Sequence, residues 1–241
     1  MARPLPKGIL FDLDDTILSA YGRPDIAWHK VALEFAQHIA PLAPDALAAR
    51  ITAEAQEFWR DAERHKEWRA KLDDARRIIV ARAFAAFDNA GHAESLRHAI
   101  ADRFTRLRDE EMKLFPGAIE TIDALRSRGV RLALITNGPS GVQRGKIARF
   151  ALEHLFDHIQ IEGEHGFGKP EERAYLHALS VLALEARDVW MVGDNLEWEV
   201  VAPQRLGIYA IWHDAYEQGL PAGSLIKPDR IITRLPQLLE I

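Results

Sequence analysis

The stretch Gly8-Ile9-Leu10-Phe11-Asp12-Leu13-Asp14-Asp15-Thr16 decides the fold of this chain, because a short apolar run there ends in three closely spaced carboxylates. The apolar part is too short for a buried helix and is typical of a buried parallel strand. Acids packed at the end of such a strand repel one another, and burial adds a desolvation penalty. A divalent cation relieves both costs, and Mg²⁺ binds carboxylate oxygens and often bridges them to a phosphate. The simpler interpretation, a helix-capping acid, needs only one Asp.

Composition sets broad limits on what the chain can be. Its 241 residues suffice for one large domain or two small ones with a sizeable core. The net charge of −5 gives no electrostatic footprint for nucleic acid, and the absence of cysteine excludes disulfides and thiolate sites. Residues 1–7 lack the apolar segment of a signal peptide, and no apolar run approaches the ~20 residues of a membrane helix. We therefore expect a cytoplasmic protein without nucleic-acid or membrane partners.

A block of helical periodicity follows the first strand and extends from residue 25 to residue 111. Apolar residues recur there at helical spacing in four stretches, which are 28–39, 47–58, 68–83 and 96–107. Pro41 and Pro44 separate the first two stretches, and Asn89 and Gly91 form a stop signal after the third. No strand pattern interrupts the block. It predicts a bundle of four amphipathic helices with a core of its own.

From Phe115 onward, strand and helix patterns alternate. Strands are expected at 130–135, 159–162, 188–192, 207–212 and 230–233, and helices at 116–128, 142–155 and 170–184. This alternation predicts an α/β fold with a doubly wound parallel sheet. The helical block interrupts it, so we expect a core domain of residues 1–18 and 112–241 and a cap domain of residues 19–111. Ligands bind such sheets at the carboxyl ends of the strands, where Asp12 falls and over which the insertion would lie as a lid.

Polar residues also follow three later strands of the predicted sheet. Thr136 and Asn137, followed by Gly138, offer a hydroxyl, an amide and open backbone N–H groups that suit a phosphate, although Asn-Gly is also a common turn. Lys169 stands on a glycine-flanked loop and can reach a phosphoryl oxygen, although most lysines are simply solvated. Asp194 follows the strand at 188–192. Each group therefore stands at a predicted strand end.

These four motifs, in this order, resemble those of the haloacid dehalogenase (HAD) superfamily. The first motif is Asp12-Leu13-Asp14-Asp15-Thr16, the second contains Thr136, the third is Lys169-Pro170, and the fourth is Gly193-Asp194 with Glu199 where the family usually has Asp. The resemblance implies a Rossmann-like HAD core with an inserted helical cap of the family's first type, C1. Glu199 could bind a metal-bound water or be structural, whereas Glu197 is expected to interact with the helix dipole.

The same resemblance assigns roles to the residues of the motifs. It implies a phosphatase in which Asp12 is the nucleophile and Asp14 the acid/base. Thr136, Asn137 and Lys169 would bind the phosphoryl group, with Thr136 and Lys169 stabilising its charge. Mg²⁺ would be held by the carboxylates of Asp12 and Asp194 and by the backbone carbonyl of Asp14. The expected reaction is hydrolysis of a small phosphorylated metabolite, of the sugar phosphate, phosphoglycolate or nucleoside monophosphate type, through an aspartyl-phosphate.

Alternatives remain open at this point. A 2-haloacid dehalogenase would need neither Mg²⁺ nor Asp14, a phosphomutase would share every motif, and a non-catalytic binding protein would not need the complete set. The chain could be a monomer or a homodimer. The loop Ser19–Pro24 and the first cap helix around Trp28 are hypothesised to line the leaving-group pocket, so that replacing Tyr21 or Trp28 by Ala would alter substrate ranking more than fold stability. The ten histidines show no metal-binding spacing, so no histidine metal site is expected.

Overall fold

The chain forms two compact units in the computed structural model, which describes residues 4–69, 71–87 and 92–240. The core unit comprises residues 1–19 and 113–241, and the helical unit comprises residues 20–112. Both boundaries lie one residue from those expected from the sequence. None of the described helices is both long and apolar enough to cross a membrane.

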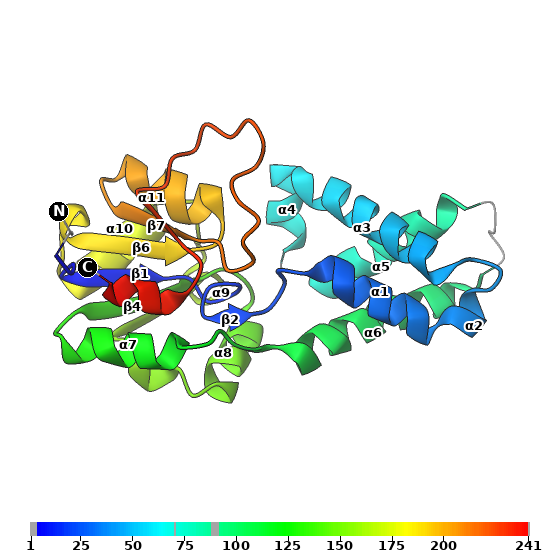
Figure 1. The fold of residues 1–241 in the computed structure, drawn as a ribbon, viewed down its shortest axis with the longest axis horizontal. Helices are drawn as coiled ribbons and strands as arrows, with labels where there is room; N and C mark the ends of the chain where they lie inside the picture. Colours follow the sequence, from blue (N-terminus) through cyan, green and yellow to red (C-terminus); the bar gives the residue numbers. More distant parts are fainter. Residues whose placement is uncertain (1–3, 70, 88–91, 241) are drawn as a thin grey trace. The chain divides into compact units, whose positions relative to one another are not determined.

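A six-stranded parallel sheet of order β5-β4-β1-β6-β7-β8 organises the core unit (Figure 1). The buried strand β1 (Gly8–Phe11) lies between β4 and β6 and pairs with both. The other strands are β4 (Arg131–Thr136), β5 (His158–Ile161), β6 (Val189–Gly193), β7 (Tyr209–His213) and β8 (Arg230–Ile232). The predicted doubly wound α/β fold is therefore confirmed.

Helices cover both faces of this sheet. Helices α10 (Glu172–Leu182) and α11 (Ala202–Arg205) lie on one face, and α7 (Ala118–Ser127) lies on the other (Figure 1). Side chains of successive strand residues point to opposite faces, so each buried strand contributes to two apolar layers. The layer under α10 and α11 includes Leu10 and Met191.

The helix after β4 is shorter than the sequence predicts. Helix α8 (Ser140–Arg149) ends six residues before the expected limit at residue 155. Ala151 has a φ of 51°, a left-handed conformation that a right-handed helix cannot contain. Residues 153–155 form a separate single turn, and the short helix α9 (Glu162–His165) follows β5.

The helical unit contains six helices among the described residues where the sequence predicts four. They are α1 (Pro24–Glu34), α2 (Ala36–Ile39), α3 (Pro44–Arg60), α4 (Ala62–Trp68), α5 (Leu72–Ala85) and α6 (Glu94–Glu111). The first stretch breaks at Phe35 and the third breaks at Lys71, because both residues have non-helical backbone angles. Apolar spacing alone does not reveal such interruptions. The stop signal at residues 89–91 lies outside the described residues.

Trp28 belongs to the core of the helical unit. Only 2% of it is exposed, and its ring stacks on Phe104 with the centroids 3.6 Å apart. The hypothesis that Trp28 lines a leaving-group pocket is therefore wrong, and truncating it would cost about 3–5 kcal/mol of stability. The corresponding hypothesis for Tyr21 stays a prediction.

A tight turn connects β1 to the segment that leads into the helical unit. Asp15 adopts a φ of 55°, and the backbone N–H of Leu18 donates to the carbonyl of Leu13. The chain then forms β2 (Leu18–Ser19), which pairs antiparallel with β3 (Lys113–Leu114). The outgoing and returning segments therefore lie side by side, and the acidic turn stays at the end of β1.

Candidate active site

Three adjacent strands bring the predicted site residues to one edge of the sheet. Asp12 follows β1, Thr136 is the last residue of β4, and Asp194 follows β6. Phe11 is in register with Leu134 of β4 and with Val192 of β6. Because parallel strands end at the same edge, Asp12, Thr136 and Asp194 are placed close together by topology alone.

Lys169 lies at the centre of the site and is fully buried. Its Nζ lies 2.5 Å from Oδ1 of Asp12 and 2.7 Å from Oε1 of Glu199. Burial alone would lower the pKa of Lys169, but the two carboxylates outweigh that effect and raise the pKa above its usual value. The lysine is therefore a permanent positive charge beside the predicted nucleophile.

Glu199 has a defined structural role in this arrangement. It stands in a π-helical turn (Leu196–Val201), pairs with Lys169, and accepts a hydrogen bond from the backbone N–H of Asn195 at 2.7 Å. Burial raises the pKa of Glu199 to about 7, opposed by Lys169. A Cβ on Gly193 would lie 2.0 Å from Cγ of Glu199, so only glycine permits this approach. From the sequence, Glu199 is expected either to bind a metal-bound water or to be structural. Its contacts favour the structural role, in which it positions Lys169.

Asn137 also holds the Lys169 loop. Its Nδ2 donates to the carbonyl of Lys169 at 2.7 Å, and its Oδ1 accepts from the backbone N–H of Lys169 at 2.9 Å. A Cβ on Gly168 would lie 2.5 Å from that Oδ1, which explains the glycine before the lysine. The Asn137 side chain is therefore committed to the loop, and this arrangement differs from the predicted contact with phosphate.

Two site residues that the sequence analysis missed come from α8. Lys146 places its Nζ 2.7 Å from both carboxylate oxygens of Asp14, and Gln143 donates to Oδ2 of Asp14 at 3.0 Å. Gln143 also donates to Oγ1 of Thr136. Both side chains are buried although they are polar, and three residues apart they share one helix face. A search for buried polar pairs on the helix after the second motif would have found them.

The site carries more negative than positive charge. Burial raises the pKa of Asp12, and burial together with Glu199 and Asp12 raises the pKa of Asp194 well above its usual range. Lys169 is the lysine that balances the first of these acids. A surplus of buried carboxylates is the electrostatic environment that a divalent cation stabilises, and an all-oxygen donor set suits Mg²⁺. The residues present therefore fit a Mg²⁺ ion.

Asp14 can contribute to such a site through its backbone rather than its side chain. Its carboxylate is turned toward Lys146 and Gln143. Within the ranges that the structure describes, no three carboxylates bring oxygens within 4.8 Å of one another. A donor set of two carboxylates, from Asp12 and Asp194, and one carbonyl, from Asp14, stays a prediction.

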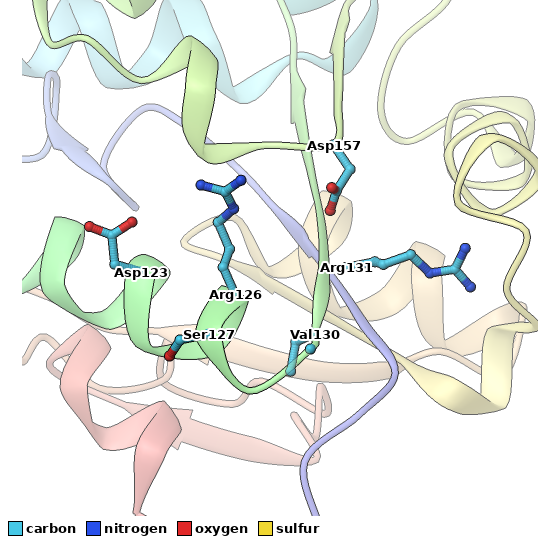
Figure 2. A pocket seen from close by; sticks show the side chains of 7 residues that line it. Asp123, Arg126, Ser127, Val130, Arg131 and Asp157 are labelled. Atoms are coloured by element: carbon cyan, nitrogen blue, oxygen red, sulfur yellow. The ribbon is translucent and has the colours of Figure 1, made fainter.

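A shallow pocket elsewhere on the core unit is not part of this site. Figure 2 shows it between the end of α7 and the start of β4, with Arg126, Arg131 and Asp157 among its lining residues. β4 runs from Arg131 to Thr136, so the pocket lies at the amino edge of the sheet, opposite the carboxylates.

Comparison with known proteins agrees with this geometry. The family model for haloacid dehalogenase-like hydrolases matches residues 6–207. Phosphoserine phosphatase of Thermus thermophilus is 31% identical over 86% of this chain and 88% of its own length. Glyceraldehyde 3-phosphate phosphatase of Pyrococcus furiosus is 26% identical over 98% and 92%. The solved structure of the putative HAD-hydrolase YfnB of Bacillus subtilis, bound to magnesium, superimposes with a TM-score of 0.71 at 23% identity and covers 98% of both chains.

The chain therefore belongs to the haloacid dehalogenase-like hydrolase family, as its four motifs indicate.

Proposed function

We propose that this protein is a Mg²⁺-dependent phosphatase that hydrolyses a small phosphorylated metabolite through an aspartyl-phosphate intermediate. Its class as a hydrolase of phosphoric monoesters rests on the family and on the phosphatase relatives. The finer proposal is carried by the arrangement around Asp12. Lys169 contacts one carboxylate oxygen of Asp12 at 2.5 Å, and Thr16 donates to the other at 3.1 Å.

The contacts of Asp12 support its proposed role as the nucleophile, which requires an ionised carboxylate held in one orientation. Lys169 counteracts the burial that raises the pKa of Asp12, and the two hydrogen bonds fix both carboxylate oxygens. In the proposed first step, an oxygen of Asp12 bonds to phosphorus and the leaving alcohol departs. One difficult displacement is thereby divided into two easier ones.

Asp14 is the proposed acid and base for the accompanying proton transfers. It would donate a proton to the leaving oxygen and then accept one from the water that hydrolyses the aspartyl-phosphate. Lys146 and Gln143 orient its carboxylate, and Gln143 ties the same network to the hydroxyl of Thr136. One helix, α8, therefore contacts both the proposed acid/base, Asp14, and the proposed phosphate-binding hydroxyl of Thr136.

Charge stabilisation supplies most of the catalysis in phosphoryl transfer. Lys169 and Thr136 would contact the phosphoryl oxygens. Mg²⁺, held by the carboxylates of Asp12 and Asp194 and by the carbonyl of Asp14, would add charge compensation when bound. A cap role for the helical unit stays a prediction.

The substrate class follows from what the relatives have in common. They include proteins named as phosphatases of phosphoserine, of glyceraldehyde 3-phosphate and of N-acylneuraminate 9-phosphate, and as a pyrimidine 5′-nucleotidase. These substrates are small phosphorylated molecules, as is the ribulose 1,5-bisphosphate named for a further relative, so we propose the same class here. The dehalogenases among the solved structures share the fold at 17–22% identity and support no choice of reaction.

The proposal is tested by measuring phosphate release from a panel of phosphorylated metabolites and from p-nitrophenyl phosphate, with Mg²⁺ or with EDTA. We expect Mg²⁺-dependent release that Asp12→Asn abolishes. Asp123→Asn, which removes an exposed carboxylate at the opposite edge of the sheet, is the matched control and should retain activity. Halide release from a 2-haloacid, with no phosphate release from any ester, would overturn the proposal.

A further inference from the structure

Three histidines that are distant in the sequence converge on one side of the core unit. His158 begins β5, His165 ends α9, and His177 lies within α10. One ring nitrogen from each lies within 4.8 Å of the other two, and this is the only such group of His, Cys, Asp or Glu in the described part of the chain. Because each comes from a different element, their sequence spacing carries no metal-binding pattern, and the expectation of no histidine site is open to revision.

The hydrogen bonds of two of these rings determine which nitrogen carries the proton. Nδ1 of His165 lies 3.1 Å from the carbonyl of Ile161, and a carbonyl can only accept, so this Nδ1 is protonated. Nδ1 of His177 lies 2.9 Å from Oε1 of Gln160, whose amide nitrogen donates to the carbonyl of Ala174 at 2.9 Å. Nδ1 of His177 is therefore also the donor. Both rings keep a lone pair on Nε2, as a metal ligand requires.

The third ring has an unsatisfied nitrogen. Nε2 of His158 is buried and has no hydrogen-bond partner, a state that costs about 1–3 kcal/mol. An ion that accepts an electron pair from Nε2 of His158 would satisfy this nitrogen.

We propose that His158, His165 and His177 form a binding site for one transition-metal ion of the zinc type, in addition to the carboxylate site. Imidazole nitrogens suit Zn²⁺, Ni²⁺, Co²⁺ or Cu²⁺, whereas Mg²⁺ selects oxygen ligands. Zn–N bonds of about 2.0–2.1 Å in a tetrahedron place ligand nitrogens about 3.4 Å apart. The ligand nitrogens lie within 4.8 Å of one another, so metal binding would have to draw them closer, and the rings of His165 and His177 are half-buried. A fourth position stays open to water.

The sheet separates this site from the carboxylates. β5 is an edge strand, and β4 lies between it and β1, which leads to Asp12. Two strand spacings correspond to about 10 Å. Metal binding would join β5, α9 and α10, the elements that flank the segment leading to Lys169. Binding of a metal ion to the three histidines is therefore expected to raise the melting temperature of the protein.

Aromatic packing is the competing explanation for the cluster. The three rings contact one another at centroid distances of 5.0–6.2 Å, and Phe167 packs against His165 and His177 at 5.6 and 5.7 Å. Packing alone predicts no stoichiometric metal binding, so the two explanations differ in a measurable result.

The test uses the full chain, stripped with EDTA and returned to buffer with excess MgCl₂, and titrates ZnCl₂ calorimetrically. We expect one Zn²⁺ per chain and a tetrahedral visible spectrum when Co²⁺ replaces zinc. His165→Gln and His177→Gln, which preserve side-chain size, should each weaken zinc binding at least about 100-fold. His154→Gln, an exposed histidine outside the cluster, should leave it unchanged.

Asp194→Asn distinguishes this site from the carboxylate site. It should lose the response to Mg²⁺ and keep zinc binding. Absence of one-to-one zinc binding, binding that persists in both His165→Gln and His177→Gln, or loss of zinc binding in Asp194→Asn would overturn the proposal.

Discussion

Lys169→Met tests how the site balances its buried charge. Methionine keeps most of the length of the side chain but removes the ammonium, which leaves Asp12 and Glu199 buried without their common partner. Removing one member of a buried ion pair costs about 3–5 kcal/mol. Since 1 kcal/mol shifts the melting temperature of a chain of this size by about 2–4 °C, a decrease of about 10 °C is expected. Phosphatase activity should be lost.

The pH dependence of the loss of stability in Lys169→Met identifies the cause of that loss. A carboxyl whose pKa is raised in the folded state releases its proton on unfolding. Its cost to stability therefore begins near the unfolded pKa, grows as the pH rises, and is complete above the folded pKa. Burial already raises the pKa of Glu199 to about 7 with Lys169 in place, and removing the lysine raises it further. The free energy of unfolding that Lys169→Met loses relative to the wild type should therefore be largest near pH 8 and become smaller toward pH 6.

Urea denaturation and thermal melts followed by circular dichroism, at pH 6, 7 and 8, provide the measurement. Lys7→Met is the matched control, because it breaks an exposed ion pair with Asp188 that is worth about 0–1 kcal/mol. Adding Glu199→Gln to Lys169→Met should recover part of the stability, with a coupling energy of about 0.5–3 kcal/mol. A Lys169→Met protein within 1 kcal/mol of the wild type, or a deficit that does not change with pH, would refute the reasoning.

Three further predictions concern other buried polar groups. Asp194→Asn should raise the melting temperature in EDTA, because it removes a carboxylate whose pKa is strongly raised, and should abolish stabilisation by Mg²⁺; a Mg²⁺ response that survives would contradict the metal assignment. Burial lowers the pKa of His213 from 6.5 to about 4. As the pH falls, the unfolded chain therefore protonates this histidine before the folded chain does, and the free energy of unfolding falls between these pH values by up to about 3 kcal/mol. Denaturation of His213→Gln at several pH values should lack this part of the pH dependence. Lys146→Met should lower kcat about 10- to 100-fold with little change in KM, because it releases the Asp14 carboxylate and does not itself contact substrate. Arg149→Met, which changes an exposed residue of the same helix, should match the wild type. A kcat of Lys146→Met equal to that of the wild type would contradict the positioning role.

The sequence predicts those parts of the site that depend on strand topology. Asp12, Thr136 and Asp194 follow short apolar runs, and parallel pairing of those runs brings the residues to one edge of the sheet. The sheet and its crossovers follow from the alternation of strands and helices for the same reason. These features depend on local pattern and on general rules of connection.

Features that depend on three-dimensional packing were not accessible from local pattern. The clamp of Gln143 and Lys146 on Asp14 spans about 130 residues of chain, and no spacing rule connects them. Asn137 stands where a phosphate ligand is expected, yet its amide bonds to the backbone of Lys169. Trp28 has helical spacing that is equally compatible with a pocket and with a core, and only its burial distinguishes the two.

The most direct test of the central claim is to trap the phosphoryl group on the enzyme. An Asp14→Asn variant keeps Asp12 but lacks both the proposed acid and the proposed base. It is mixed with Mg²⁺ and p-nitrophenyl phosphate, whose leaving group departs without protonation, then quenched in acid and analysed by peptide mass spectrometry. We predict one phosphoryl group per chain, on the carboxylate of Asp12, and none in Asp12→Asn. Phosphate release without a phosphorylated Asp12, or turnover that persists in Asp12→Asn, would contradict the proposed mechanism.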